Sequence, residues 1–475
     1  MRIKYIIFSA FIFMLGVQSC APTKQVRYAN KSLPEMYSND NLDTLSVAKL
    51  NYETFFKDSK LIQLIDTALA NNQELNIFMQ QIALANNEIQ VRKGEYLPFV
   101  NYNAGVEVEK VGEYTRNGSV EQNLSIREGE AFPEPLTNYT IGLSATWELD
   151  IWKKLRTSKK AAVMEYLATI EGRNFIVTNL VSEIAENYYE LIALDNQLKI
   201  IDRNLELQNS ALEVVKLQKQ AAKATEFAVK RFKAEVLKNK SERFEIKQKI
   251  TESQNKLCFL IGKKPKSIDR SSEDFLNLEI NSLTAGIPSQ LLSNRPDIRQ
   301  AEYELAAAKL NVKVARKSFY PSLGLRAGLG LEAFNPKFII KTPESLLYGL
   351  TTDIVGPLIN RRAIKAIYNN ANAKQLQAVY EYEMTILKGF IEVENGLSNI
   401  NNLKQNYINK NKEVLTLNQS IDIVGKLYQS ARADYMEVLL TQRDALEAKI
   451  DLVKTKKEQL IANVNVYRAL GGGWR

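Results

Sequence analysis

The stretch Asn294–Glu332, NRPDIRQAEYELAAAKLNVKVARKSFYPSLGLRAGLGLE, is present twice in the chain. Moving the sequence by 223 positions, from 71 to 294, places Asn71–Glu109 on it without a gap. The residues of the first copy that meet an identical residue include Asn71, Ala83, Ala85, Pro98, Ala104, Gly105 and Glu109. A duplication of this length indicates two copies of one structural unit, which we place at residues 59–290 and 291–475.

Each copy has the pattern of a helix followed by a strand. Pro296 suits the first turn of a helix, and Asp297 faces the positive end of the helix dipole. Apolar residues recur at helical spacing until Tyr320 and Pro321, after which they alternate with polar residues. The predicted elements are helices over 73–94 and 296–318, followed by β-hairpins over 98–150 and 321–357.

Each predicted strand is apolar on one face and polar on the other for about ten residues, the length of a tilted transmembrane β-strand. A small soluble antiparallel sheet would alternate in the same way. Aromatic residues gather at the same strand ends and favour the membrane interpretation, in which they form an interfacial girdle: Tyr96, Trp147, Trp152, Phe319 and Tyr320. The basic pairs at 153–154 and 361–362 either face lipid headgroups or are ordinary solvated charges.

Four strands cannot close a barrel, and an open sheet edge is not viable in lipid. A membrane location would therefore require several chains to share one sheet. Three chains would supply twelve strands, so the predicted assembly is a homotrimer with a 12-stranded transmembrane β-barrel.

After each hairpin the apolar period changes to the heptad spacing of packed helices. No proline interrupts 153–220, which at 1.5 Å per residue is a helix of roughly 100 Å. Thr225 then caps a returning helix over 226–260. The second copy has a matching pair, over 361–429 and 434–470. Such heptads also occur in cytosolic coiled coils, but together with the strands they predict a mixed α and β fold, in which the barrel continues into a hollow cylinder of long helices.

The amino terminus has the pattern of an export signal. Arg2 and Lys4 precede an apolar run that is too short to span a bilayer and ends in Ser19-Cys20. Residues 1–19 resemble a bacterial lipoprotein signal, and this resemblance implies that cleavage leaves Cys20 as an acylated first residue. The alternative is an ordinary signal peptide with an incidental cysteine. Residues 20–58, which are rich in polar residues, would then form a lipidated tether.

The composition excludes several kinds of site. The chain has no histidine, which removes His-based catalytic triads and His metal ligands. Of its two cysteines, Cys258 lies at an apolar helix end and is predicted to be a buried small apolar residue. The net charge of +9 is not gathered into a basic block, so no nucleic-acid partner is expected. The glycines at 471–473 are predicted to end a helix. We expect no cofactor, no metal and no enzymatic activity.

Five short motifs are spread over nearly the whole chain: WELD at 147–150, LIG at 260–262, LSNRPDI at 292–298, FYPS at 319–322 and YRALGGGW at 467–474. In this order they resemble the outer-membrane efflux family, the TolC-like and OprM-like channel-tunnels, and in particular its lipoprotein branch. The resemblance implies a trimer in the outer membrane of a Gram-negative bacterium, with a periplasmic α-helical barrel. It also implies two partners, a periplasmic adaptor and an inner-membrane efflux pump.

The resemblance further implies a gate at the periplasmic helix tips, near the second helix turn. The residues carried over are Tyr428, Arg432, Asp434, Glu437 and Leu440. The carry-over is partial, because Leu440 stands where some members have a second acidic residue. The turn residues implied to contact the adaptor are Ala222, Thr225, Glu226, Ala431 and Ala433. Glu437 would form a charged ring in the trimer, or else pair with a basic residue on the outer surface.

The function implied is a passive duct from the periplasm to the exterior. A coiled-coil lipoprotein that tethers the outer membrane to periplasmic components is the alternative. A tether would need the heptads but not the four alternating strands.

The amino terminus generates one prediction. Cys20→Ala removes the thiol that acylation requires, so metabolic labelling with a fatty-acid analogue should mark the unaltered protein and not the variant. Export should continue, because the apolar run is unchanged. Equal labelling of both proteins would contradict lipidation at Cys20.

Overall fold

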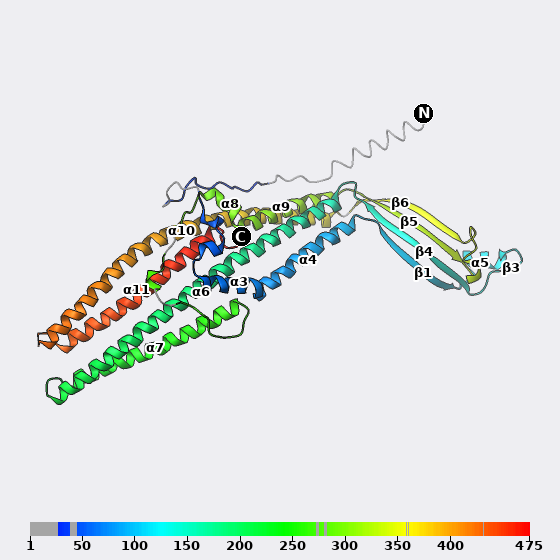
Figure 1. Ribbon diagram of the computed structural model, residues 1–475. Coiled ribbons are helices and arrows are strands. Elements are labelled where there is room, and N and C mark those ends of the chain that lie inside the picture. Colours follow the sequence, from blue (N-terminus) through cyan, green and yellow to red (C-terminus); the bar gives the residue numbers. More distant parts are fainter. Residues whose placement is uncertain are drawn as a thin grey trace. The chain divides into compact units, whose positions relative to one another are not determined.

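The computed structural model describes a protein of mixed helix and sheet (Figure 1). The described residues are 27–38, 45–271, 275–279, 283–357, 359, 361–430 and 432–475. They divide into two compact units, and each unit takes segments from both sequence copies. The first unit covers 27–28, 84–166 and 303–379, and the second covers 29–83, 167–302 and 380–475, within the described residues.

The first unit contains a four-stranded antiparallel sheet in the order β1-β4-β5-β6 (Figure 1). The strands are β1 (Phe99–Glu109), β4 (Leu136–Leu149), β5 (Ser322–Ala333) and β6 (Leu346–Val355). Each predicted hairpin therefore forms, one from each copy. The pairing of β4 with β5 joins them, with Tyr139 opposite Ala333 at one end and Leu149 opposite Leu323 at the other.

The register places the apolar residues of all four strands on one face. Tyr102 lies opposite Leu143, Leu143 opposite Leu329, and Leu329 opposite Tyr348. Since directly opposed residues share a face, this row and its neighbours make a continuous apolar surface. The other face carries small and polar residues, for example the row Asn101, Ser144, Gly328 and Gly349.

The connections at the loop end of the sheet contain more structure than the sequence predicted. Between β1 and β4, within the hairpin predicted over 98–150, lie α5 (Arg116–Asn123), β2 (Ser125–Arg127) and β3 (Glu130–Ala131). The 3-10 helix η4 (Pro336–Phe338) lies between β5 and β6. Thr115 caps α5 through Gly118, and such short capped turns have no apolar periodicity that would reveal them.

The helices that precede or follow the strands in sequence begin and end close to their predicted bounds. They are α4 (Gln73–Glu95), α6 (Lys154–Gln220), α9 (Pro296–Lys317) and α10 (Arg362–Gln429), and parts of all four belong to the first unit. Within that unit, Phe319 packs on Tyr368 of α10, with ring centroids 6.0 Å apart, and on Ala315 of α9.

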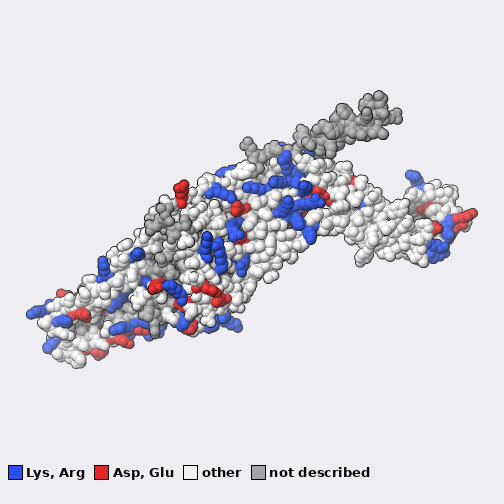
Figure 2. All heavy atoms as spheres, turned by 45° about the horizontal axis from the view of Figure 1, so that its top comes forward, with Lys and Arg blue, Asp and Glu red and all other residues white. Residues whose placement is uncertain are grey.

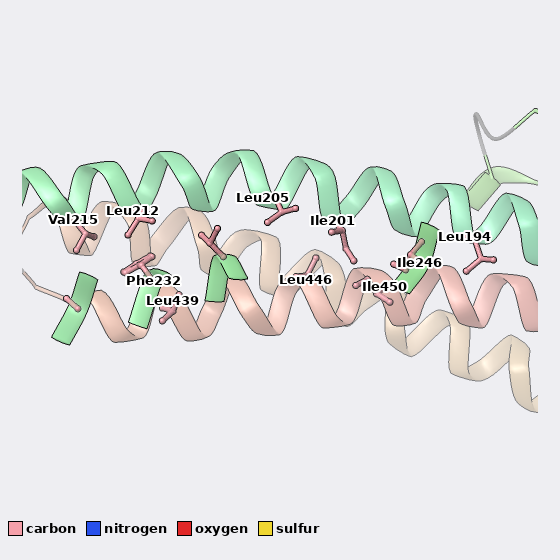
Figure 3. Packing of buried hydrophobic residues seen from close by; sticks show 12 residues of the cluster. Leu194, Ile201, Leu205, Leu212, Val215, Phe232, Ile246, Leu439, Leu446 and Ile450 are labelled. Atoms are coloured by element: carbon pink, nitrogen blue, oxygen red, sulfur yellow. The ribbon is translucent and has the colours of Figure 1, made fainter. Parts of the chain in front are cut away.

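In the second unit, α6 packs against α7 (Glu226–Leu260) and α11 (Tyr435–Ala469) (Figure 3). Their shared core consists of Leu194, Ile201, Leu205, Leu212, Val215, Ala228, Phe232, Val236, Ile246, Leu439, Leu446 and Ile450. The smaller helices of this unit are η1 (Val47–Lys49), α2 (Tyr52–Phe55), α3 (Ser59–Asn71), η2 (Phe275–Asn277), η3 (Pro288–Gln290) and α8 (Leu291–Asn294).

A buried arginine joins three helices of the second unit. Arg295 is 4% exposed and makes a two-point ion pair with Asp297 at 2.7 and 3.0 Å. Its Nη1 also donates to Glu392 of α10 and to the carbonyl of Ala469 at the end of α11, both at 2.8 Å. A buried guanidinium is stable only when its donors are satisfied in this way. The helix end predicted at 471–473 is observed, with Gly471 at φ +91°.

The described part of the predicted tether is packed and is not a loose linker. Tyr37 is 4% exposed and stacks on Phe390 of α10 at 5.7 Å. Phe55 stacks on Tyr467 of α11 at 3.9 Å, and the hydroxyl of Tyr467 donates to the carbonyl of Leu50. The polar residues around these aromatic side chains give the segment the composition of a linker, so the sequence did not predict that it packs against α10 and α11. Cys20 and the predicted signal lie outside the described residues. Of the helices in the described residues, none combines the length and apolarity needed to cross a membrane.

The sheet generates a second prediction. Gly330 lies opposite Gly142, and a Cβ added at Gly330 would lie 2.7 Å from the carbonyl oxygen of Ile141. Gly330→Val should therefore destabilise the β4–β5 pairing, by about 1–3 kcal/mol. Gly349→Val is the matched control, because nothing lies within 4 Å of the added Cβ at that glycine. The temperature at which the strand circular dichroism is lost should fall for Gly330→Val only. Equal losses would contradict the close approach.

Candidate functional site

The turn between α10 and α11 holds the residues predicted to form a gate. The carboxylate of Asp434 accepts hydrogen bonds from the backbone N–H of Met436 and of Glu437, at 2.7 and 3.0 Å, and so caps α11. Glu437 and Leu440 follow on the first turns of α11 with exposed side chains. Asp434 therefore stabilises the start of α11, whereas the Glu437 side chain is exposed to solvent. Ala433 is half-buried, and Ala431 lies outside the described residues.

Tyr428 connects the two long helix pairs within one chain. Its hydroxyl donates to Oε1 of Gln218 on α6, at 2.6 Å. The resemblance implied that Tyr428 and Arg432 belong to the gate, and within the described part of this chain Tyr428 is the one of the two that contacts α6. Arg432 is exposed, and among the described residues its guanidinium forms no ion pair. Gln218 was not singled out, because a single glutamine near a helix end carries no sequence signal.

The turn between α6 and α7 is built in a similar way. Ala222 has a left-handed backbone conformation, with φ +59°, and the Lys223 N–H donates to the Gln218 carbonyl at 2.8 Å. The matching bond in the second turn runs from the Arg432 N–H to the Leu427 carbonyl, also at 2.8 Å. Thr225 caps α7 as predicted, since its hydroxyl accepts from the Ala228 N–H at 3.2 Å.

Glu226 is exposed at the start of α7 and pairs with two lysines. Lys219 donates to its carboxylate, and Lys230 lies 3.5 Å away. The hydrogen bond from Lys219, and then the charge of that lysine, lower the pKa of Glu226. The first turn therefore presents a carboxylate that is already paired with lysines of its own chain, whereas Glu437 of the second turn has no ion pair within the described part of the chain.

The predicted interfacial aromatics form two kinds of contact. Trp147 donates from Nε1 to the carbonyl of Tyr96 at 3.0 Å. Trp152 donates to the carbonyl of Pro321 at 2.7 Å and stacks on Tyr320 at 5.1 Å. These rings cluster where strands meet helices. Phe319 differs, because it is 6% exposed in the helix core described above and offers no surface to lipid in this chain.

One face of the sheet is apolar, and large side chains on it are exposed in the single chain. Tyr348 is 77% exposed and Leu350 is 71% exposed. On the side of the molecule seen in Figure 2, the strands are almost without charged atoms, and charges gather at the loop end. A continuous exposed apolar face of this kind marks a surface that binds a partner or a membrane.

The basic residues that follow the hairpins are engaged locally. Lys154 lies 3.4 Å from Glu148, and Arg361 donates from Nη2 to the carbonyl of Phe319 at 3.0 Å. These contacts tie helix starts to strand ends. Lys154 and Arg361 thus each have at least one partner within the chain.

Within the described part of the chain, no three His, Cys, Asp or Glu residues gather closely enough to hold a metal ion. Cys258 is buried, as predicted, and its Sγ lies 3.4 Å from the carbonyl oxygen of Lys266.

Comparison with known proteins identifies the class. The family model described as outer membrane efflux protein matches residues 64–263 and 287–472. The chain belongs to this family, which consists of efflux channels and not of enzymes.

The relatives and solved structures cover nearly the whole chain. The pyoverdine export outer membrane protein OpmQ of Pseudomonas putida is 28% identical over 422 residues, which are 88% of this chain and 87% of that protein. The cation efflux system protein CusC of Escherichia coli O6:H1 is 25% identical over 470 residues, 98% of each chain. The open state of the MtrE outer membrane channel of Neisseria gonorrhoeae has a TM-score of 0.84 at 22% identity, covering 96% of this chain and 99% of that one. The last comparison shows the fold alone.

Proposed function

We propose that this protein is the outer-membrane channel of a tripartite efflux system, a passive duct from the periplasm to the exterior. The observation that carries the proposal is the sheet of β1, β4, β5 and β6, whose register gathers an exposed apolar face on one side and a polar, glycine-rich face on the other. In a membrane, the first face suits lipid and the second suits a water-filled lumen. The relatives named for pyoverdine export and cation efflux support this assignment.

The open edges of the sheet support a trimer. Among the described strands, β1 and β6 each pair on one side only, which leaves a row of backbone groups unsatisfied. Lipid offers no hydrogen bonds to such groups, so β1 of one chain pairs with β6 of the next until the barrel closes. Three chains give twelve strands, a barrel wide enough for a channel.

The partners follow from the same assignment. An outer-membrane duct has no energy source of its own, so an inner-membrane pump delivers the substrate and a periplasmic adaptor connects the two proteins. The helix turns offer the adaptor two different surfaces: the turn with Ala222, Thr225 and Glu226, which is neutralised by its own lysines, and the turn with Ala431 and Ala433. The lipidated Cys20 adds an anchor in outer-membrane lipid.

Glu437 and its neighbours form the gate in this proposal. Three exposed Glu437 carboxylates around a threefold axis repel one another and attract cations from the periplasm. Leu440, one helical turn further on, narrows the same passage with an apolar ring. The hydrogen bond from Tyr428 to Gln218 holds the α10–α11 turn against α6, and Arg432 adds a contact to a neighbouring helix pair in the assembly.

Two measurements on the purified protein test the duct. Native mass spectrometry in mild detergent should show three chains, and the same sample should give discrete single-channel currents in a planar bilayer. A structural tether would give no currents. A stable monomer that retains its strand signal would contradict closure between chains.

The gate is tested by a matched pair of variants. Glu437→Gln removes the proposed ring charge, so the reversal potential across a salt gradient should shift toward lower cation selectivity, with the trimer unchanged. Glu213→Gln is the charge-matched control, because Glu213 lies outside the proposed gate and its carboxylate pairs with Lys216 of its own helix at 2.7 Å. Its reversal potential should stay close to that of the unaltered channel.

Closure is tested by resting conductance. Tyr428→Phe deletes the donor to Gln218 while keeping the ring, and Arg432→Ala deletes the guanidinium. Both variants should conduct more at rest. Unchanged resting currents would exclude Tyr428 and Arg432 from the gate. In the selectivity experiment, an unchanged reversal potential for Glu437→Gln would exclude that carboxylate from the pore.

A further inference from the structure

Three cations surround one aromatic ring at the loop end of the sheet. The guanidinium carbon of Arg127 lies 4.5 Å from the centroid of Phe338, and the amino groups of Lys337 and Lys341 lie 4.9 and 5.3 Å from it. Arg127 belongs to β2, in the connection of the first hairpin, whereas the other residues belong to the connection of the second. We call Arg127, Lys337 and Lys341 the loop cluster.

The turn that carries the lysines is fixed by its own hydrogen bonds. Asn335 caps η4 by accepting from the Lys337 N–H at 3.2 Å, and the Lys341 N–H donates to the Phe338 carbonyl at 2.9 Å. Phe334 packs beside Phe338, with centroids 5.2 Å apart. The chain therefore holds both amino groups near the ring through ordered backbone, and their proximity does not depend on a flexible loop.

The loop cluster is a concentration of positive charge without a matching carboxylate. Among the described residues, no Asp or Glu oxygen lies within 4.0 Å of any of the three cations. Glu130 is opposite Arg127 in the β2–β3 pairing but makes no such contact. A phenyl ring has two faces for cations, so it cannot fully satisfy three. At physiological ionic strength the screening length is about 8 Å, and repulsion within the cluster persists over its short distances.

The chemistry of the cluster fits a phosphate group. A guanidinium and two ammonium groups offer several charge-assisted donors to one tetrahedral anion, which has oxygens enough to accept them together. Ile340, between the two lysines in sequence, is 79% exposed and gives the turn an apolar side chain beside the charges. A surface that combines basic groups with exposed apolar side chains suits the boundary between headgroups and acyl chains.

We propose that Arg127, Lys337 and Lys341 form a binding site for the phosphate of a phosphorylated glycolipid in the outer leaflet of the outer membrane. This inference rests on the proposed function, which places the loop end of the sheet on the exterior side. The bound headgroup bridges the connections of the two hairpins at the mouth of the duct and neutralises the cluster.

The test uses the full-length protein in mild detergent and two probes, bis-phosphorylated lipid A and the same lipid after removal of its phosphates. Binding is measured by native mass spectrometry as the fraction of protein that retains the glycolipid. The unaltered protein should prefer the phosphorylated form. Lys337→Gln and Lys341→Gln should each weaken its binding by about fivefold, the usual effect of one basic residue at an anionic membrane surface. The triple variant Arg127→Gln/Lys337→Gln/Lys341→Gln should lose the preference.

Lys110→Gln is the charge-matched control, because Lys110 lies in the same loop region but pairs with Glu134 at 2.7 Å. Its binding should equal that of the unaltered protein. The inference is overturned if both lipids bind equally, if the control weakens binding as much as Lys337→Gln, or if millimolar inorganic phosphate occupies the site and displaces the lipid. Single-channel currents from the same samples keep the two proposals apart, since loss of glycolipid binding with normal currents rejects this site and leaves the duct intact.

Discussion

The pairing of β4 with β5 is the constraint on which the rest of the structure depends. It joins two hairpins that are far apart in the sequence, through an unbroken register from Tyr139 to Leu149. At Gly142 and Gly330 the two backbones approach so closely that a side chain would meet a carbonyl oxygen. In sequence, α9 leads into β5 and β4 leads into α6, so this register is carried by strands that adjoin the end of α9 and the start of α6.

The helical part is held together by a different kind of interaction. An apolar seam runs between α6, α7 and α11, and buried polar groups fix particular points within the second unit. Arg295 illustrates the principle, because its guanidinium is removed from water and finds its partners within the protein: Asp297 beside it, Glu392 on α10 and the carbonyl of Ala469 at the end of α11. Arg295 directly precedes the start of α9 and also binds the last residue of α11.

The same physical problem, how to satisfy exposed polar and apolar groups, recurs in the sheet and at the helix turns. At the sheet, one chain leaves backbone groups and an apolar surface that only neighbouring chains and lipid can satisfy. At the helix tips, Asp434 and Thr225 satisfy the backbone locally by capping, and the Glu437 carboxylate stays exposed. At the loop end, the three cations around Phe338 have no carboxylate within ion-pair distance among the described residues.

The sequence by itself determined the element types, because a change from helical spacing to alternation is a local property that each segment carries in its own residues. The helices over 73–94 and 296–318, both hairpins and the Thr225 cap were predictable for this reason. Only the tertiary structure decided the partners of those elements. It buried Phe319 against Tyr368, docked Tyr37 on Phe390 and brought Tyr428 to Gln218, whose positions are 210 residues apart in the sequence. Such contacts arise from how whole helices pack, and a single aromatic or glutamine carries no local pattern that names its partner.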